Sequence, residues 1–293
     1  MDAQAVMRTR FAPSPNGALH LGHAYAAMCA HDLARQMGGE FLLRIEDIDG
    51  VRSRPELIDA IFADMRWLGL AWDGEVLFQS TRLAAYDAAL AELKARGLLY
   101  PCFCTRSQIA AAGARPGPEG LVYPGTCRAL DTDERARRMA SEPHCWRLDM
   151  AAAIAQTGAL IWHDLEAGEQ AARPDLFGDV VLARKDAPAS YHLAVTLDDA
   201  HQRISHVVRG SDLFAATHVH RLLQALLDLP VPEYCHHVLL AGPDGRKLAK
   251  SEGAAALASL RDAGADGWAL LENLRKAMLP SGISWGEPSY TYA

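Results

Sequence analysis

The sequence predicts an α/β fold in which helices cover both faces of a parallel sheet. Strand and helix patterns alternate through the first hundred residues, which is typical of parallel sheets. Apolar residues make up 50% and charged residues 22% of the 293 residues, an ordinary balance for a globular protein that buries its core without covalent links. A change of composition near residue 102 indicates a segment inserted between two halves of the sheet.

The alternation of the first half can be followed element by element. A loop of two prolines, an asparagine and a glycine follows the first strand, and paired glycines end the first helix. The second strand is apolar and ends in an acidic cluster, and the next helix has proline near its start and glycine near its end. We expect a strand over 7–12, a helix over 21–37, a strand over 41–45, and helices over 55–70 and 83–97.

The second half begins with a different kind of segment. Half of the residues from 113 to 126 are glycine or proline, so we expect no regular structure there. Strands over 191–197 and 206–209 and a helix over 218–229 are expected to return to the sheet. The expected organisation is a first catalytic half (1–101), an inserted α+β subdomain (102–185), a second catalytic half (186–252) and a short helical C-terminal segment (253–293).

Charge and cysteine content exclude several classes of protein. The net charge of −7 argues against a protein that coats nucleic acid without specificity, although a local basic face remains compatible with it. We find no apolar run long enough to span a membrane and no secretory signal at the N-terminus. Six cysteines are too few for a disulfide scaffold. We therefore expect a cytoplasmic protein without a membrane partner, and a monomer.

The segment from Arg10 to His23 is a strand end, a turn and a helix start. Free N–H donors and the positive end of the dipole at a helix N-terminus suit phosphate. Gly22 would let a nucleotide approach the backbone, and His20 and His23 could donate hydrogen bonds to phosphate oxygens. Neither a G-x-G-x-x-G nor a Walker A pattern is present. Taken alone, such a histidine pair is more often a set of surface or capping residues.

Two lysines, Lys247 and Lys250, follow a glycine-containing turn. Ammonium groups in a loop of this kind could close over a triphosphate and neutralise its charge in the transition state. An isolated pair of lysines is more often part of an ordinary solvated loop. The two motifs together are more specific than either one, because both suit the same ligand.

Together these motifs resemble those of the class I aminoacyl-tRNA synthetase family. Residues 20–23 (HLGH) resemble its HIGH motif and residues 247–251 (KLAKS) resemble its KMSKS loop, with Leu21 and Ala249 in place of the usual residues. Four further segments look like the glutamyl branch: RFAPSP at 10–15, RIEDID at 44–49, YHLAV at 191–195 and VRGSDL at 208–213.

The resemblance covers about residues 8–251 and implies a Rossmann-like, doubly wound parallel sheet. It implies an enzyme, a ligase that activates L-glutamate with ATP and Mg²⁺ as glutamyl-adenylate. The catalytic residues that it implies are His20, His23, Lys247 and Lys250. The ATP-binding residues that it implies are His20, Gly22, His23 and Lys250.

Glutamate has two carboxylates and one ammonium group, so its site needs cations and an anion. Arginine suits the carboxylates, because its planar guanidinium makes bidentate contacts. Arg10 and Arg209 could bind them, Glu46 could take the α-ammonium group, and Tyr191 could donate its hydroxyl. Each residue taken alone could instead be a surface or packing residue. With the resemblance added, the expected glutamate-binding residues are Arg10, Phe11, Ala12, Pro13, Ser14, Glu46, Tyr191 and Arg209.

Three cysteines of the inserted segment have metal-ligand spacing: Cys102, Cys104 and Cys127. Three thiolates could bind one structural Zn²⁺, which would stabilise a glycine- and proline-rich loop and needs a fourth ligand. The resemblance implies Tyr123, because a Tyr-x-x-x-Cys pattern occurs at this place in the family. His144 or Cys145 as the fourth ligand, or thiols without metal, remain alternatives.

The acceptor of the glutamyl group is implied by the resemblance alone. Only 42 residues follow Ser251 in the 293-residue chain, where glutamyl-tRNA synthetases have long anticodon-binding domains. The resemblance is therefore closest to the truncated glutamyl-queuosine tRNA(Asp) synthetase family, which transfers glutamate to queuosine in the anticodon loop of tRNA(Asp). Alternatives are a split glutamyl-tRNA synthetase that charges a tRNA 3′ end, an inactive RNA- or amino-acid-binding regulator, and a pantothenate synthetase-like ligase.

Overall fold

The computed structural model describes residues 6–248, 255–287 and 290. Its first part alternates strands and helices: β1 (Arg8–Phe11), α1 (Leu21–Gln36), β2 (Glu40–Ile45), α2 (Pro55–Trp67), β3 (Leu77–Phe78) and α3 (Leu83–Ala95). These bounds agree closely with the ranges expected from the sequence. None of the helices in the described ranges has the length and apolar character needed to cross a membrane.

The central sheet is parallel except for its edge strand β9, which pairs antiparallel with β8, and it has two halves that meet at their first strands. One half has the order β1-β2-β3, and the other has β11 (His206–Gly210), β12 (Glu233–His237), β8 (Ile161–Asp164) and β9 (Gly168–Ala171). β1 lies beside β11, where the Ser205 N–H donates to the Arg8 carbonyl at 3.0 Å. The chain thus runs outward from β1 in one direction and from β11 in the other, which makes a topological switch point.

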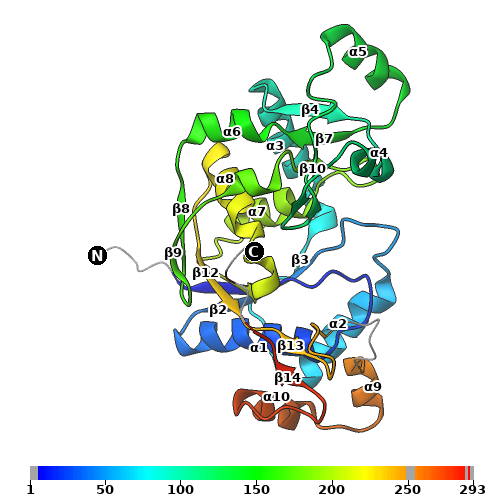
Figure 1. Cartoon of the computed structure of the whole chain (residues 1–293). Coiled ribbons are helices and arrows are strands. Elements are labelled where there is room, and N and C mark those ends of the chain that lie inside the picture. Colours follow the sequence, from blue (N-terminus) through cyan, green and yellow to red (C-terminus); the bar gives the residue numbers. More distant parts are fainter. Residues whose placement is uncertain (1–5, 249–254, 288–289, 291–293) are drawn as a thin grey trace.

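Helices cover both faces of this sheet, as expected for the α/β class. In β2, Phe41 and Leu43 are buried against α1, whereas Leu42 packs with a cluster on the opposite face that contains Trp162 and Phe214. That opposite face is covered by α7 (Tyr191–His201) and α8 (Ala216–Leu226). Figure 1 shows α1 and α8 on opposite sides of the strands. The fold class predicted from the sequence is confirmed.

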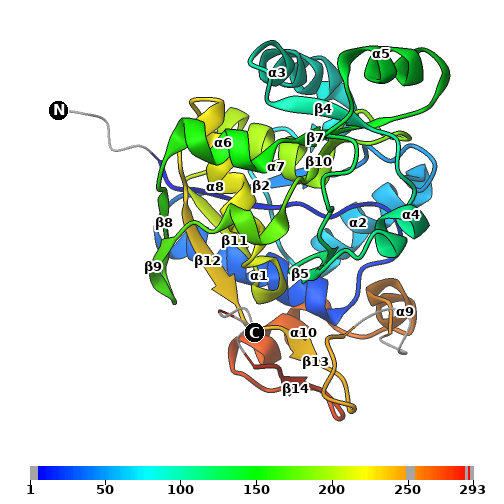
Figure 2. The same cartoon turned by 45° about the horizontal axis from the view of Figure 1, so that its top comes forward.

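The inserted segment and the residues just before it form a second, antiparallel sheet of order β10-β7-β4, with the strands Val181–Ala183, Cys145–Leu148 and Leu99–Cys102. Around it lie α4 (Arg106–Ala111), α5 (Thr132–Ser141) and α6 (Met150–Thr157), with α5 at the far end of the molecule (Figures 1 and 2). β8 and β9 instead extend the central sheet, because Asp164 of β8 pairs with Tyr234 of β12. Part of the segment 102–185 therefore completes the central sheet, and the domain boundaries stay a prediction.

Two local predictions are wrong. Residues 191–197 were expected to form a strand, but they belong to helix α7. The helix was not recognised from the sequence because it is buried on nearly all sides, so its apolar residues have no helical period. Ser190 caps this helix by accepting from the Leu193 N–H. A serine at this position was the feature of the sequence that could have indicated a helix start. Within 113–126, β5 (Pro116–Gly117) and β6 (Gly120–Leu121) form a short hairpin, with Gly120 at φ +105° directly after its turn.

The C-terminal segment packs against the first half of the catalytic core. It contains α9 (Leu257–Asp262), α10 (Gly267–Arg275) and β14 (Ser284–Trp285), and β14 pairs with β13 (Leu240–Ala241). Leu257 and Leu271 are buried in the same core cluster as α1 and β2. Arg275 of α10 donates to Asp32 of α1 at 2.7 Å. The segment is therefore an integral part of the catalytic unit, although it is not entirely helical.

This packing predicts that the C-terminal segment supports the stability of the whole catalytic unit. Leu271 is 1% exposed, and Leu271→Ala should lower the free energy of unfolding by about 3 kcal/mol, because it removes buried methyl groups and leaves a cavity. The control is Leu83→Ala on α3, where the leucine is 38% exposed and a loss below about 1 kcal/mol is expected. Urea unfolding followed by circular dichroism measures both; equal losses would contradict the shared core.

Candidate active site

The predicted site residues surround two adjoining cavities at the switch point of the sheet. A cavity of about 190 Å³ is lined by residues of both phosphate motifs, namely His20, Gly22, His23 and Lys247. A cavity of about 420 Å³ is lined by all the predicted glutamate-binding residues: Arg10, Phe11, Ala12, Pro13, Ser14, Glu46, Tyr191 and Arg209. His23 and Gly210 line both cavities, so the two are continuous. The cleft lies at the carboxyl ends of β1, β2 and β11, where open α/β sheets bind ligands.

The two histidines form the N-terminal cap of α1. His20 Nδ1 accepts from the Gly22 N–H and His23 Nδ1 accepts from the His20 N–H, each at 3.1 Å. Because Nδ1 is an acceptor in both rings, the proton of each neutral imidazole is on Nε2. Both rings therefore have an N–H donor that suits a phosphate oxygen. A Cβ atom at Gly22 would lie 3.0 Å from His20 Cε1, so a side chain there would disturb this cap.

Lys247 is brought to the same cavity from the other half of the chain. It pairs with β13 through an isolated bridge to Ala241, and its ammonium group makes an ion pair with Asp212. Asp212 also lines the cavity. The second lysine of the motif, Lys250, lies outside the described residues, so its catalytic and ATP-binding roles stay predictions.

A buried ion network surrounds one wall of the larger cavity. Asp199 of α7 accepts from Arg10 Nε at 2.9 Å and from Arg44 Nη1 at 2.7 Å. Arg44 has no exposed surface and also contacts Glu46 Oε1 at 3.4 Å. Burial raises the pKa of Asp199, but the two guanidinium groups outweigh burial and keep this pKa below its usual value. For Glu46, burial outweighs Arg44 and Arg10, so its pKa is raised.

Arg209 of β11, which also lines the larger cavity, is held by partners on several elements. Its Nε donates to His236 Nε2 at 3.0 Å and its Nη2 donates to Thr217 Oγ1 at 2.7 Å. Its Nη1 contacts His220 Nδ1 at 3.2 Å and the Tyr191 hydroxyl at 3.4 Å. These contacts engage four of the five N–H donors of the guanidinium. Arg209 is therefore rigid before any ligand binds.

The partners that orient these arginines were not among the residues predicted from the sequence. Asp199 and Arg44 are central to the buried ion network. The sequence did contain an indication of it, because Asp198 and Asp199 follow an apolar segment and a buried carboxylate needs a partner. Tyr191 was expected on a strand, but it is the first residue of α7 and faces the cavity from the helix N-terminus. His220 and His236 had no recognisable pattern.

The three cysteines of the inserted segment meet as expected for a metal site. The sulfur atoms of Cys102, Cys104 and Cys127 lie within 4.8 Å of one another. The Tyr123 hydroxyl lies 3.6 Å from Cys104 Sγ and accepts from the Cys127 N–H at 2.7 Å. His144, by contrast, contacts the Glu142 carbonyl through Nδ1 at 3.3 Å. The cluster is a possible metal site with three thiol ligands.

Cys145 lies on the other side of this cluster. Its Sγ donates to the carbonyl of Cys102 at 3.5 Å. Hydrogen bonding with Cys145 also lowers the pKa of the Cys102 thiol, which favours its thiolate form. A thiolate is the form of cysteine that binds metal.

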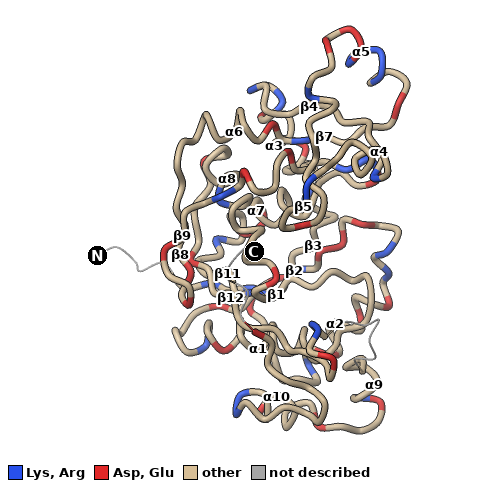
Figure 3. The backbone as a smooth tube through the Cα atoms, in the orientation of Figure 1, with Lys and Arg blue, Asp and Glu red and all other residues tan. Residues whose placement is uncertain are grey.

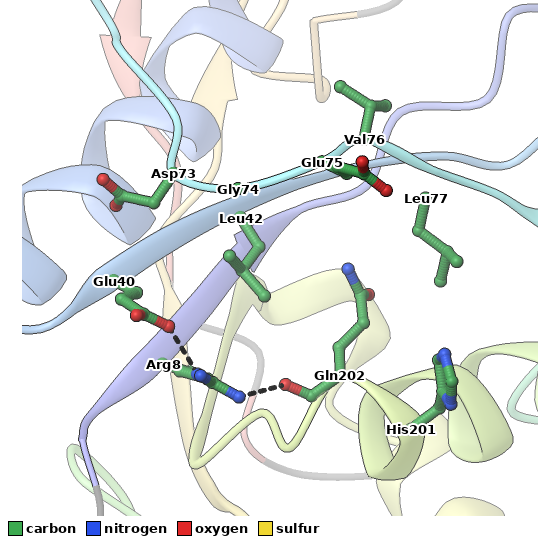
Figure 4. Close-up of a pocket in the computed structure, with 10 residues that line it drawn as sticks. All are labelled: Arg8, Glu40, Leu42, Asp73, Gly74, Glu75, Val76, Leu77, His201 and Gln202. Carbon is green, nitrogen blue, oxygen red and sulfur yellow. Dashed lines mark hydrogen bonds and ion pairs between the residues drawn. The ribbon is translucent and has the colours of Figure 1, made fainter.

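A further cavity of about 400 Å³ lies at the opposite edge of the sheet (Figure 4). It is lined by the first residues of β1 and β2, Arg8 and Glu40, whose side chains are 2.5 Å apart, together with Asp73 and Glu75. None of the predicted site residues lines it. The amino ends of the strands are also the wrong edge for ligands in this class of sheet.

The surface charges of α5 do not form a single basic face. Lys or Arg and Asp or Glu lie side by side along this helix (Figure 3). Arg137 pairs with Glu134 and Arg138 pairs with Glu142, the latter at 2.8 Å. Helix α5 therefore does not by itself form the local basic face with which the net charge of the chain is compatible.

Comparisons with known proteins agree with this geometry. Residues 6–283 match the family described as tRNA synthetases class I (E and Q), catalytic domain. The Glutamyl-Q tRNA(Asp) synthetase of Rhodobacter capsulatus is 48% identical over 274 residues, which cover 88% of this chain and 96% of that protein. The enzyme of the same name from Symbiobacterium thermophilum is 45% identical over 266 residues, which cover 87% of this chain and 81% of that protein.

The fold is shared with a solved structure. The crystal structure of glutamate-tRNA synthetase from Elizabethkingia anophelis superposes with a TM-score of 0.72 at 28% sequence identity. The match covers 85% of this chain but only 53% of that one. The family resemblance is confirmed: the chain belongs to the class I tRNA synthetases for glutamate and glutamine, as a member built on their catalytic domain.

Proposed function

We propose that this enzyme activates L-glutamate with ATP and transfers the glutamyl group to queuosine in the anticodon loop of tRNA(Asp). One observation carries the activation half: the two phosphate motifs and the charged pocket, which come from distant parts of the sequence, line one continuous cleft. The acceptor half is supported by relatives named Glutamyl-Q tRNA(Asp) synthetase that match most of the chain.

In the first step, the α-carboxylate of glutamate attacks the α-phosphorus of ATP and pyrophosphate leaves. We assign His20 and His23 to hydrogen bonds with phosphate oxygens, because both rings have Nε2–H donors at the N-terminus of α1. Lys247 exchanges its pairing with Asp212 for the phosphates, and Lys250 is expected to act with it. Mg²⁺ bound with ATP supplies further neutralisation of the phosphate charge. The protein mainly aligns the reactants.

The charges of the larger cavity match those of glutamate. Two guanidinium groups, of Arg10 and Arg209, and the carboxylate of Glu46 line this cavity, while Arg44 and Asp199 form an ion pair outside its lining. The wall therefore has one net positive charge, and glutamate has one net negative charge. We assign the substrate carboxylates to Arg10 and Arg209, and the α-ammonium group to Glu46. Tyr191 and the backbone of residues 11–14 complete the pocket.

The acceptor is tested with ATP, labelled glutamate and purified tRNA. We expect label on tRNA(Asp) that contains queuosine and none on the same tRNA without queuosine. tRNA(Glu) is the control that distinguishes transfer to queuosine from charging of a tRNA 3′ end. Label on tRNA(Glu) alone would overturn the acceptor proposal in favour of a glutamyl-tRNA synthetase, and absence of pyrophosphate exchange with every tRNA would favour an inactive regulator.

The raised pKa of Glu46 predicts a pH dependence of glutamate binding. Burial raises this pKa, and only the ionised carboxylate can bind the α-ammonium group, so KM for glutamate should increase as the pH falls through the raised value. The side-chain carboxyl of free glutamate titrates near about 4.3 and therefore later. Steady-state kinetics between pH 5 and pH 8 measure this effect, with KM for ATP as the internal control. Glu46→Gln should raise KM for glutamate and remove its pH dependence; a persisting dependence would exclude Glu46 as the titrating group.

We further propose that the cysteine cluster binds one structural Zn²⁺ through Cys102, Cys104, Cys127 and Tyr123. Thiolates bound to Zn²⁺ at about 2.3 Å in a tetrahedron are about 3.8 Å apart, and Cys104 and Cys127 already lie 3.5 Å apart. The Tyr123 hydroxyl contacts this group of sulfurs, which supports Tyr123 over His144 as the fourth ligand. The bound ion would link β4 to the glycine- and proline-rich loop.

Elemental analysis should find one zinc per chain in freshly purified protein, and none would refute the site. Tyr123→Phe should release zinc to a chelator roughly tenfold faster, because one ligand is lost while three thiolates remain. Cys145→Ser tests the alternative ligand, and Cys235→Ser on β12 is the control outside the cluster. Faster release from Cys145→Ser with no change for Tyr123→Phe would assign the fourth position to Cys145.

The cytoplasm, where ATP and tRNA are both available, is the compartment that this function implies. The monomeric state stays a prediction.

A further inference from the structure

A chain of hydrogen bonds connects the β5–β6 hairpin to Arg209. Glu119, in the turn of the hairpin, lies with Oε2 3.1 Å from His192 Nε2. His192 Nδ1 lies 3.2 Å from His220 Nε2, and His220 Nδ1 lies 3.2 Å from Arg209 Nη1. Four side chains from the inserted hairpin, α7, α8 and β11 are thus joined in one line.

Only one arrangement of protons lets every contact in this line be a hydrogen bond between neutral imidazoles. A guanidinium can only donate, so Arg209 donates to His220 Nδ1, and the His220 proton is on Nε2. That proton is donated to His192 Nδ1, which leaves the His192 proton on Nε2 for the Glu119 carboxylate. Burial, followed by the nearby Arg209, keeps the pKa of His220 well below its usual value, in agreement with a neutral ring.

Arg209 has a second chain of hydrogen bonds, which ends at a buried carboxylate and not at the surface. Its Nε donates to His236 Nε2, and His236 Nδ1 lies 2.6 Å from Asp164 Oδ2. Asp164 and His236 are completely buried and belong to β8 and β12, so this relay is a fixed part of the core. The Glu119 side chain is 47% exposed, while His192 is 7% exposed. The first relay therefore begins at the surface, on a hairpin of the inserted segment.

We propose that Glu119 is a positioning residue for glutamate binding, which acts on Arg209 through His192 and His220. It sets the proton positions of both imidazoles and so holds the whole Arg209 guanidinium, through Nη1, in the orientation needed for the substrate carboxylate. The hairpin that carries Glu119 thereby becomes part of the amino-acid site, although it lies outside the cleft itself. The inference rests on the proposed function, because it takes Arg209 as a ligand of glutamate.

The surroundings of Glu119 hold it in contact with His192. The hairpin turns at Pro118 and Glu119, and Gly120 after the turn has φ +105°. A Cβ atom at Gly117 would lie 2.4 Å from Val122 Cγ2, so the backbone of the hairpin is closely packed. Burial raises the pKa of Glu119, but the hydrogen bond from His192 and the nearby positive charge together outweigh burial and keep this pKa below its usual value. The carboxylate is therefore ionised and accepts from His192 at neutral pH.

Glutamate binding by the whole enzyme tests the relay, first by calorimetry without tRNA and then as KM in pyrophosphate exchange. E119A should weaken glutamate binding roughly tenfold, the usual effect of losing a hydrogen bond to a charged group. KM for ATP should stay within about twofold, because the histidine and lysine motifs are untouched. E119Q should bind within about threefold of the unchanged enzyme, since its amide oxygen can still accept from His192 Nε2.

A mutant cycle separates the relay from a loss of folding. If Glu119 acts only through His192, the variant with both E119A and H192A should bind glutamate no more weakly than H192A alone. Glu142→Ala, which removes an exposed ion pair of the same inserted segment, is the matched control and should leave glutamate binding unchanged. Thermal unfolding checks that all variants remain folded.

The outcomes are distinct. Equal glutamate binding by E119A and the unchanged enzyme overturns the inference and leaves the proposed function intact. Additive losses in the double variant, or an E119Q variant as weak as E119A, also overturn it. An unchanged enzyme that does not bind glutamate refutes the proposed function itself.

Discussion

The site depends on a single buried carboxylate that accepts from two strands. Asp199 of α7 accepts from Arg10 of β1 and from Arg44 of β2, and Arg44 in turn contacts Glu46. Removing one partner of a buried ion pair costs several kcal/mol, because the remaining charge has no compensation. The network therefore fixes the distance between the two strands and the helix above them. It also fixes Arg10 and Glu46, which are on the wall of the cleft.

Local patterns were enough to predict most of the first half of the fold. Proline at the start of α2 and the glycines after α1 mark helix ends by backbone conformation alone, so their bounds could be inferred from neighbouring residues. α7 was missed, because a helix buried on nearly all sides has no polar face to reveal its period. The pairing of β8 with β12 was also unpredictable, since it joins Asp164 to Tyr234, far apart in the chain.

The site shows the same division between local and distant information. Residues next to strand ends, such as Arg10, Glu46 and Arg209, could be assigned from position and charge, and they line the cleft. The groups that orient them, such as Asp199 and His236, contribute one side chain each from helices and strands whose packing no short motif specifies. Residues that orient a site residue in this way can be identified only from the folded structure.

If the larger cavity binds glutamate as proposed, its charge also determines which other amino acids it rejects. Glutamine has nearly the shape of glutamate but lacks its second negative charge, so it would leave one of the facing guanidinium groups without compensation. A site built to bind a charged or hydrogen-bonding group rejects analogues without it by about 10⁴-fold or more, whereas one missing methylene group costs only about 1–3 kcal/mol. Fidelity against glutamine would thus come from Arg10 and Arg209, already fixed by their neighbours, and fidelity against aspartate from the length of the pocket.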